Sequence, residues 1–466
     1  MTISFKGVDE IRGPLIFVKN PHDVASQELV KVYSKDGHPR LGRVLEVSTE
    51  VACVEVFEGT SGLAVETTDV EFLGDTLTVG VSEDMFGRVF DGLGRPRDKK
   101  EVTYETKAPI VPEVRLPYTG SPINPFMREY PHEVIITGLS AIDGLNSLIR
   151  GQKLPIFTGQ GLPHNKLAAQ IVRQARVLTN EPFVVIFVGI GILQEEVLFF
   201  ESQFQELQAT QNVVTFLNLA EDPSIERLIA PRVALTAAEY FAFQKDMHVL
   251  VVMTDITNYA EALRELSSAK GEIPSRKGFP GYMYSDFASI YERAGRIHGK
   301  KGTITLVPVI SMPNDDITHP IPDLTGYITE GQIVLSRTLY QQGIYPPVEV
   351  LSSLSRLMKD GVGEGRTRGD HMDVASQLYA LYSESLDLRE LESIIGAESL
   401  SRVDRIVLEF GNDFEKVFLN QGEEENRSVE DTLSLAWKIM SKVPRQRLIR
   451  ISEKWLKKYY APETTR

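Results

Sequence analysis

Disulfide partners, long apolar runs and an excess of basic residues are all missing from this sequence. Its one cysteine, Cys53, lies in the apolar run 51–54, so no intramolecular disulfide can form and the thiol is expected in a core. The longest apolar runs, 183–188 and 249–253, fall far short of the ~20 residues that span a bilayer. Lysine and arginine number 50 against 64 acidic residues, for a formal charge of −14. Because nucleic acid and anionic lipid are bound by basic surfaces, neither is expected as the main ligand.

The sequence also lacks a histidine pattern typical of metal sites and a secretory targeting signal. The eight histidines include no pair four residues apart and have no cysteine partner, so we predict no metal site within this chain. Residues 1–6 lack the apolar stretch of a secretory signal peptide. We therefore expect a cytoplasmic protein that reaches a membrane only through partners.

The length of 466 residues predicts more than one domain, because a single hydrophobic core stops growing near ~250–300 residues. Hydrophobic residues make up 42% of the chain and charged residues 24%, as in folded globular proteins, which excludes a mainly disordered or collagen-like chain. We divide the sequence into three parts, residues 1–75, 76–360 and 361–466.

The first part, residues 1–75, is predicted to form a small closed β-barrel. Short apolar segments recur at roughly 8–12 residues, separated by turns that contain Gly, Pro or Asp. The expected strands are Leu15–Val18, Glu28–Tyr33, Gly42–Val47 and Val51–Phe57. Gly and Pro are dense in the following segment, 86–131, whose interspersed apolar residues indicate an ordered linker.

The middle part alternates between apolar strands and amphipathic helices. The expected strands are Leu154–Phe157, Phe183–Val188, Val213–Leu217, Val249–Met253 and Ile304–Ile310. Helices are expected at Lys166–Arg176, Glu195–Gln208 and Tyr259–Ala269. Fully apolar strands joined by crossover helices predict an α/β domain with a mainly parallel sheet, whose ligand would lie at the carboxyl ends of the strands.

After residue 360 the pattern becomes entirely helical and predicts a C-terminal α-helical bundle. Ser428 and Asp431 have the spacing of a capping box at the start of one helix. The expected helices are Asp373–Tyr382, Leu386–Ile395, Val403–Asn420, Ser428–Ser441 and Arg445–Tyr459. Their charged faces are either solvated or a surface for a partner helix.

A glycine-containing turn after the first core strand has the context of a phosphate-binding P-loop, but its chemistry is degenerate. Gly159 matches the first glycine of G-x-x-x-x-G-K-[ST], and Gly161 adds a second glycine inside the loop. His164, Asn165 and Lys166 take the places of the second glycine, the lysine and the hydroxyl residue. Without that lysine and hydroxyl, the phosphates lose their charge partner and Mg²⁺ loses a ligand. On this motif alone, the alternative that the segment is an ordinary strand–turn–helix, and not a phosphate-binding loop, stays open.

The presence or absence of acidic residues after two of the expected strands also bears on whether this chain hydrolyses a nucleotide. Asp255 ends the run 248–255, which contains the expected apolar strand Val249–Met253, in the Walker-B arrangement in which a carboxylate orders Mg²⁺. Residues 189–193, which follow the expected strand Phe183–Val188, include no acid to orient an attacking water, and Glu195 and Glu196 come later, inside the expected helix. A self-sufficient nucleotide hydrolase is therefore disfavoured.

Long blocks of this sequence resemble the B subunit of the V/A-type rotary ATPases. The matching blocks are 87–96, 138–144, 161–165, 280–284 and 312–332, and they extend over nearly the whole chain. The resemblance implies an N-terminal β-barrel, a RecA-like nucleotide-binding domain and a C-terminal helical domain. It also implies a non-catalytic protein that alternates with catalytic A subunits in an A3B3 ring, together with central shaft and peripheral stalk subunits, on the cytoplasmic face of a membrane.

The resemblance also implies roles for particular residues. Arg356, in the run Ser353–Arg356, matches the family's arginine finger, and Ser355 supports it. ATP or ADP with Mg²⁺ would be bound at the shared interface, mainly by the catalytic A subunit. Tyr327 lies in a block that lines the nucleotide pocket in the family, although a core tyrosine is an equal alternative. On the B side, Gly159, Gly161, His164, Asn165, Lys166 and Asp255 would form at most a weak or vestigial nucleotide site.

Two other function classes share this core. A flagellar or secretion-type ATPase would hydrolyse ATP alone, against which Asn165 and the missing acid after the strand 183–188 both argue. A hexameric RNA motor of the terminator type would need a basic, aromatic surface, which the charge of −14 disfavours. Whether protons or sodium ions are moved is decided in other subunits, so both remain open.

Overall fold

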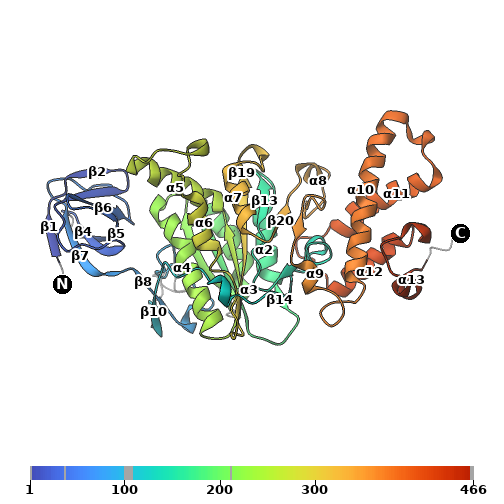
Figure 1. The fold of residues 1–466 in the computed structure, drawn as a ribbon, viewed down its shortest axis with the longest axis horizontal. Coiled ribbons are helices and arrows are strands. Elements are labelled where there is room, and N and C mark those ends of the chain that lie inside the picture. Colours follow the sequence, from blue (N-terminus) through green and yellow to red (C-terminus); the bar gives the residue numbers. More distant parts are fainter. Residues whose placement is uncertain (1–2, 36–37, 99–108, 210–212, 462–466) are drawn as a thin grey trace. The chain divides into compact units, whose positions relative to one another are not determined.

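The computed structural model describes residues 3–35, 38–98, 109–209 and 213–461 (Figure 1). The chain forms two compact units, each built from two segments. Unit 1 comprises Met1–Asn124 and Val184–Arg293, and unit 2 comprises Pro125–Phe183 and Ala294–Arg466.

Unit 1 begins with a curled antiparallel sheet of seven strands in the order β1-β7-β4-β5-β6-β3-β2. All four predicted strands are present, and β4 has the predicted bounds, with buried and partly exposed side chains alternating strictly along it. The strands are β1 Ile3–Lys6, β2 Glu10–Arg12, β3 Leu15–Lys19, β4 Glu28–Tyr33, β5 Pro39–Val47, β6 Val51–Val56 and β7 Asp69–Thr76.

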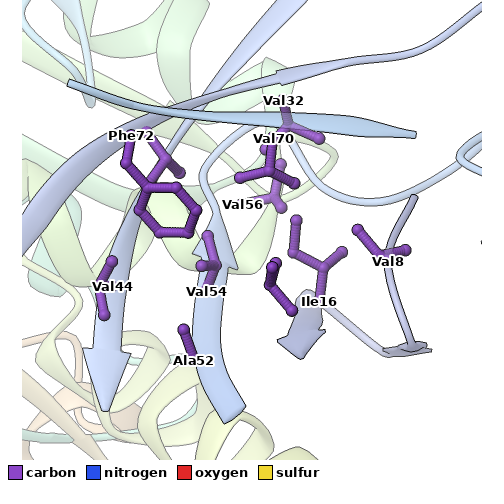
Figure 2. Packing of buried hydrophobic residues seen from close by; sticks show 11 residues of the cluster. Val8, Ile16, Val32, Val44, Ala52, Val54, Val56, Val70 and Phe72 are labelled. Atoms are coloured by element: carbon purple, nitrogen blue, oxygen red, sulfur yellow. The ribbon is translucent and has the colours of Figure 1, made fainter. Parts of the chain in front are cut away.

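The core of this sheet is almost entirely aliphatic (Figure 2). Val32, Val54, Val70 and Phe72 are fully buried and belong to one cluster. Cys53, on β6, is buried as predicted, and desolvation raises the pKa of its thiol to about 11. A thiol that stays protonated at neutral pH is a poor nucleophile, so Cys53 is a core residue.

The rest of unit 1 is an α/β layer in which β15 and β16 pair in parallel. A third parallel strand, β9, comes from the Gly/Pro-rich segment and pairs with β16, so this part of the expected linker is an edge strand of the sheet. The strands are β8 Thr78–Val81, β9 Val89–Asp91, β10 Val114–Pro117, β15 Phe183–Ile192, β16 Val213–Leu219 and β17 His248–Thr254. The helices are α3 Gln194–Ala209, α4 Ser224–Phe243, α5 Ile256–Lys270 and α6 Met283–Tyr291, with 3-10 turns at Glu83–Met85 and Arg276–Gly278.

Helix α4 is absent from the sequence-based expectation. Most of its side chains are buried, so it has apolar residues on nearly every side and no amphipathic stripe to predict it.

Unit 2 contains the first strand of the predicted α/β core. Strands β20, β13 and β19 run parallel, and β21 is added antiparallel to β20 at the edge. The strands are β11 Val134–Ile136, β12 Leu148–Ile149, β13 Ile156–Gly159, β14 Arg176–Val177, β18 Gly295–Arg296, β19 Thr303–Met312, β20 Gly331–Val334 and β21 Leu354–Ser355. The accompanying helices are α1 Ser140–Asp143, α2 His164–Gln174, α7 Pro320–Ile328, α8 Arg337–Gln341 and α9 Met358–Gly361, with 3-10 turns at Pro125–Met127 and Pro313–Asp315.

The C-terminal part of unit 2 is helical, as predicted. Its elements are α10 His371–Ile395, α11 Arg402–Asp413, a π-helical turn Phe414–Leu419, α12 Val429–Met440 and α13 Glu453–Tyr459, with 3-10 turns at Ala397–Ser399 and Arg445–Arg447. Ser428 caps α12, and its side chain and that of Asp431 form the predicted capping box. No bilayer-spanning helix is found in the part of the chain that the structure describes.

Two predicted helix boundaries are wrong. The helices expected at Asp373–Tyr382 and Leu386–Ile395 are one helix, α10, because residues 383–385 contain no Gly or Pro to break it. The single helix expected at Arg445–Tyr459 is interrupted. The backbone N–H of Arg450 donates to Gln377 and that of Ser452 donates to Asp373, so side chains of α10 hold this segment out of a helical conformation.

Candidate functional site

The glycine turn follows β13 and leads directly into α2, in the strand–turn–helix order of a phosphate loop. Gly161 has φ +79° and lies open to solvent, so the turn itself has the expected backbone form. The Nδ1 atom of His164 lies 3.0 Å from the carbonyl oxygen of Leu162. The ammonium of Lys166 forms an ion pair with Glu423 at 2.7 Å. The one lysine near the motif position is thus directed to the C-terminal segment.

A carboxylate lies against the first glycine of this turn. Asp315 forms a bidentate ion pair with Arg337, at 2.7 and 3.0 Å, and Arg337 also donates to the carbonyl oxygen of Gln160 at 2.8 Å. Any side chain on Gly159 would collide with the Asp315 carboxylate. The hydrogen bonds from Arg337 lower the pKa of the Asp315 carboxyl, so the group is an anion at neutral pH. An internal ion pair therefore lies against the degenerate loop, with its carboxylate directed at Gly159.

Asp255 lies in unit 1, at the end of β17. Its carboxylate accepts a hydrogen bond from the backbone N–H of Thr257 at 2.8 Å and caps α5. In the same unit, Glu195 is exposed, and Glu196 accepts from the N–H of Leu193 at 2.7 Å, at the start of its own helix. Each of these acidic positions has a local role at a helix N-terminus or faces solvent.

The Ser-x-Ser-Arg run alternates between buried and exposed residues because its two middle residues form the edge strand β21. Ser353 and Ser355 are buried, whereas Leu354 is 51% exposed and Arg356 is exposed. The hydroxyl of Ser355 donates to the carbonyl oxygen of Ser147 at 2.8 Å, and that of Ser353 donates to the carbonyl oxygen of Glu349 at 2.7 Å. Both serines therefore anchor the strand and leave the arginine side chain outside.

The Arg356 guanidinium makes one hydrogen bond, from Nη1 to the carbonyl oxygen of Thr329 at 3.3 Å. Within the described residues it has no carboxylate partner. It lines a cavity of about 910 Å³ bounded by β21, the loop before it and one side of α10. Tyr379 of α10 and Arg450, which precedes α13, also line this cavity. This size is in the range of small-molecule and cofactor sites. An uncompensated guanidinium beside such a cavity is suited to bind an oxyanion.

Tyr327 is 72% exposed, near the end of α7. The alternative that Tyr327 is a core residue is therefore wrong. Of the residues predicted for the B-side site, the structure places Gly159, Gly161, His164, Asn165 and Lys166 along one strand–turn–helix of unit 2, whereas Asp255 belongs to unit 1. The two residues predicted for the shared catalytic site lie together, Ser355 on β21 and Arg356 directly after it. Among the residues that the structure describes, no three His, Cys, Asp or Glu side chains cluster closely enough to hold a metal ion.

Comparison with known families matches all three parts of the chain. Residues 8–74 match the beta-barrel domain of the ATP synthase alpha/beta family, and residues 138–355 match its nucleotide-binding domain. Residues 360–460 match the C-terminal domain of V and A type ATP synthase. The chain belongs to the B-subunit family of V/A-type ATP synthases.

Individual relatives of this B-subunit family cover almost the full length. A V-type ATP synthase beta chain from Halothermothrix orenii is 57% identical, over 99% of this chain and 98% of its own length. The B subunit of the A-type ATP synthase from Aeropyrum pernix is 55% identical, over 98% of this chain and 97% of its own length. Among solved structures, the ATP synthase subunit NeqB from Nanoarcheaum equitans is 36% identical with a TM-score of 0.71, covering 92% of this chain and 99% of that one.

Sequence reasoning missed the ion pair of Asp315 and Arg337 at the mouth of this loop. Asp315 belongs to a block that resembles the family, but nothing in the sequence indicates that its carboxylate turns toward Gly159. Both Asn314 and Asp315 have positive φ, +58° and +55°, and this unusual backbone aims the side chain. Asn and Asp are both enriched at positive φ, and their succession at 314–315 is the sequence signal for this turn.

Proposed function

We propose that this chain is the non-catalytic, regulatory B subunit of a rotary V/A-type ATP synthase, alternating with catalytic A subunits in an A3B3 ring. The observation that carries the proposal is Arg356. It is exposed beside a cavity, it lacks a carboxylate partner within the described residues, and its backbone is anchored by two buried serines. In this arrangement, the arginine is free to complete an ATP site on a neighbouring protein of the ring.

The B-side loop supports a non-catalytic role. Asn165 stands where an intact P-loop has its lysine, and the ion pair with Glu423 directs Lys166 elsewhere. The carboxylate of Asp315 further opposes phosphate at Gly159. These residues do not fit a Mg²⁺–nucleotide complex, so any nucleotide here would bind weakly. ATP or ADP with Mg²⁺ would instead be held at the shared interface, mainly by the A subunit.

The contribution of Arg356 to the shared site would be electrostatic. As the γ-phosphoryl group is transferred, charge shifts onto its oxygens, and a bidentate guanidinium stabilises that charge without having to gain or lose a proton. Arginine fingers of this kind accelerate phosphoryl transfer by about 10³–10⁵, which corresponds to roughly 4–7 kcal/mol of barrier. Ser355 would contribute by holding the strand, since its hydroxyl is committed to the carbonyl oxygen of Ser147.

The assembly would couple this chemistry to ion transport. Central shaft and peripheral stalk subunits would connect the ring to a membrane-embedded sector that moves protons or sodium ions, with this chain on the cytoplasmic face as a peripheral component. We propose no role in binding nucleic acid.

The test is a ring reconstituted with a catalytic A partner and either wild-type chain or Arg356→Ala. We expect the variant to assemble normally and to lose about 10³-fold in kcat for ATP hydrolysis. Arg366→Ala is the matched control, because it removes another exposed arginine from the same unit. Near-normal turnover by the Arg356→Ala ring would exclude the finger assignment.

A further inference from the structure

The backbone of Arg356 is attached to a buried hydrogen-bond network in unit 2. Its N–H donates to the carbonyl oxygen of Glu330 at 3.0 Å, immediately before β20. The next residue, Gly331, pairs with Ser355 in the antiparallel β20–β21 ladder. The approach of the two strands is so close that a side chain at Gly331 would collide with the backbone of Leu354. The location of Arg356 is therefore set by what holds Glu330 and Ser355.

One side chain joins both of these residues. Gln152 is fully buried, and its Nε2 donates to the carbonyl oxygen of Glu330 and to the hydroxyl oxygen of Ser355, both at 3.0 Å. Its Oε1 accepts from the backbone N–H of Ile149 at 3.0 Å, which fixes the amide orientation. The amide thus uses both of its donors on the two residues that flank Arg356 in space.

The neighbouring residue reinforces the same connection. Lys153, only 3% exposed, forms an ion pair with Glu330 at 2.7 Å, and its backbone N–H donates to the same carboxylate at 2.8 Å. The N–H of Glu330 donates to the carbonyl oxygen of Lys153 at 3.0 Å. Glu330 is consequently held through both its backbone and its side chain, and its carbonyl oxygen offers Arg356 a fixed acceptor.

We infer that Gln152 is a positioning residue for Arg356. Its buried amide hydrogen-bonds to both Glu330 and Ser355 and so fixes the position of the Arg356 main chain, from which the guanidinium extends. The inference rests on the proposed function of Arg356 as a finger. Gln152 itself touches no substrate and acts only through the arginine. Because a misplacement of about 1 Å in a reacting group costs up to about 10²-fold in rate, loss of this amide is expected to lower turnover more than substrate binding.

The experiment compares reconstituted rings that carry Gln152→Met, Arg356→Ala or both substitutions. Methionine has nearly the same length as glutamine and no donor. We expect Gln152→Met to lower kcat by about 10–100-fold with KM for ATP changed less than about threefold. In the Arg356→Ala background the same substitution is expected to have no further effect on kcat, because there is no guanidinium left to position.

A matched control separates positioning from stability. Gln170 is also fully buried, and its amide also donates to two carbonyl oxygens, those of Gly422 and Glu425, both at 3.1 Å. Gln170→Met should lower the melting temperature of the chain to a similar degree but leave kcat of the ring within about twofold. Should Gln152→Met fail to assemble, Gln152→Glu takes its place, since it keeps the volume and removes the amide donors.

The outcomes are distinct. Full turnover by the Gln152 variant, or an equal loss of kcat in the presence and absence of Arg356, would overturn the inference. Normal turnover by Arg356→Ala alone would instead overturn the proposed function, whatever the Gln152 variant does.

Discussion

At the scale of single residues, two exposed arginines of unit 2 differ in how their charge is paired. Arg356 is exposed without a carboxylate partner among the described residues, whereas Arg337 is paired with Asp315 in two hydrogen bonds. Sequence reasoning identified the first through a resemblance and gave no sign of the second. The reason is physical: the direction of Asp315 depends on a left-handed backbone at Asn314 and Asp315, and local composition does not specify it.

We predict that Asp315→Ala strengthens nucleotide binding by the isolated chain. Removing the carboxylate takes an anion away from Gly159 and leaves Arg337 available to a phosphate group. Allowing for solvent screening of an exposed charge, the expected gain in affinity for ATP is about tenfold, measured by isothermal titration calorimetry.

The control for this prediction is Glu398→Ala, which removes an exposed negative charge from the same unit without changing the contact at Gly159 or the ion pair of Lys166. If both variants gained affinity equally, the cause would be net charge and the prediction would be wrong.

At the scale of elements, the C-terminal helices are attached to the core of unit 2 through α1 and the start of α10. The Nε2 atom of His371, the first residue of α10, lies 3.1 Å from the carbonyl oxygen of Gly144, and its Nδ1 lies 3.0 Å from the hydroxyl of Thr367. Burial lowers the pKa of His371 to about 4, because the charged imidazolium is poorly solvated there. The ring is therefore neutral at physiological pH.

We predict that acid weakens this attachment. The unfolded chain binds a proton at His371 near the ordinary pKa of 6.5, whereas the folded chain does so only near 4, so stability is lost as pH falls from 6.5 toward 4. The expected loss from this group is about 3 kcal/mol. Denaturant unfolding followed by tryptophan fluorescence suits the measurement, because both tryptophans, Trp437 and Trp455, lie in the C-terminal helices.

In His371→Gln, we expect lower stability at pH 7 and a shallower decline of the unfolding free energy between pH 6.5 and 4. Asp143 acts in the opposite direction, since burial raises the pKa of its carboxyl to about 6, and it is unchanged in both proteins. The difference between wild type and variant therefore isolates the histidine. Parallel pH curves for the two proteins would contradict the prediction.

At the scale of the whole molecule, the fold class was predictable and the details of contact were not. Strand β4 and the capping box of α12 are confirmed because each depends on residues close together in the sequence. Helix α4 was missed because it is apolar on nearly all sides, and the break before α13 was missed because side chains of α10 impose it. The ion pair of Lys166 with Glu423, 257 positions away, is likewise invisible to local pattern.

The purified chain, without a catalytic partner, is predicted to hydrolyse no measurable ATP. Its loop lacks a P-loop lysine, and the carboxylate of Asp315 lies against Gly159, where a phosphate group would have to bind. Mixing it with a catalytic A partner should give both turnover and a hexameric ring, detected by a coupled ATPase assay and light scattering. Sustained turnover by the chain alone would contradict the prediction.

The attachment of Arg356 to a sheet edge has a mechanical consequence. An arginine on a loose loop can approach or leave a substrate by local motion. Here the backbone N–H of Arg356 donates a hydrogen bond to Glu330, next to β20, so the main chain of Arg356 is held to that strand. Strand β20 is in turn paired with β13, and β13 with β19, in the parallel sheet. If Arg356 completes an interfacial site as proposed, opening and closing of that site would require rigid-body displacement of this part of the protein rather than local motion of a loop.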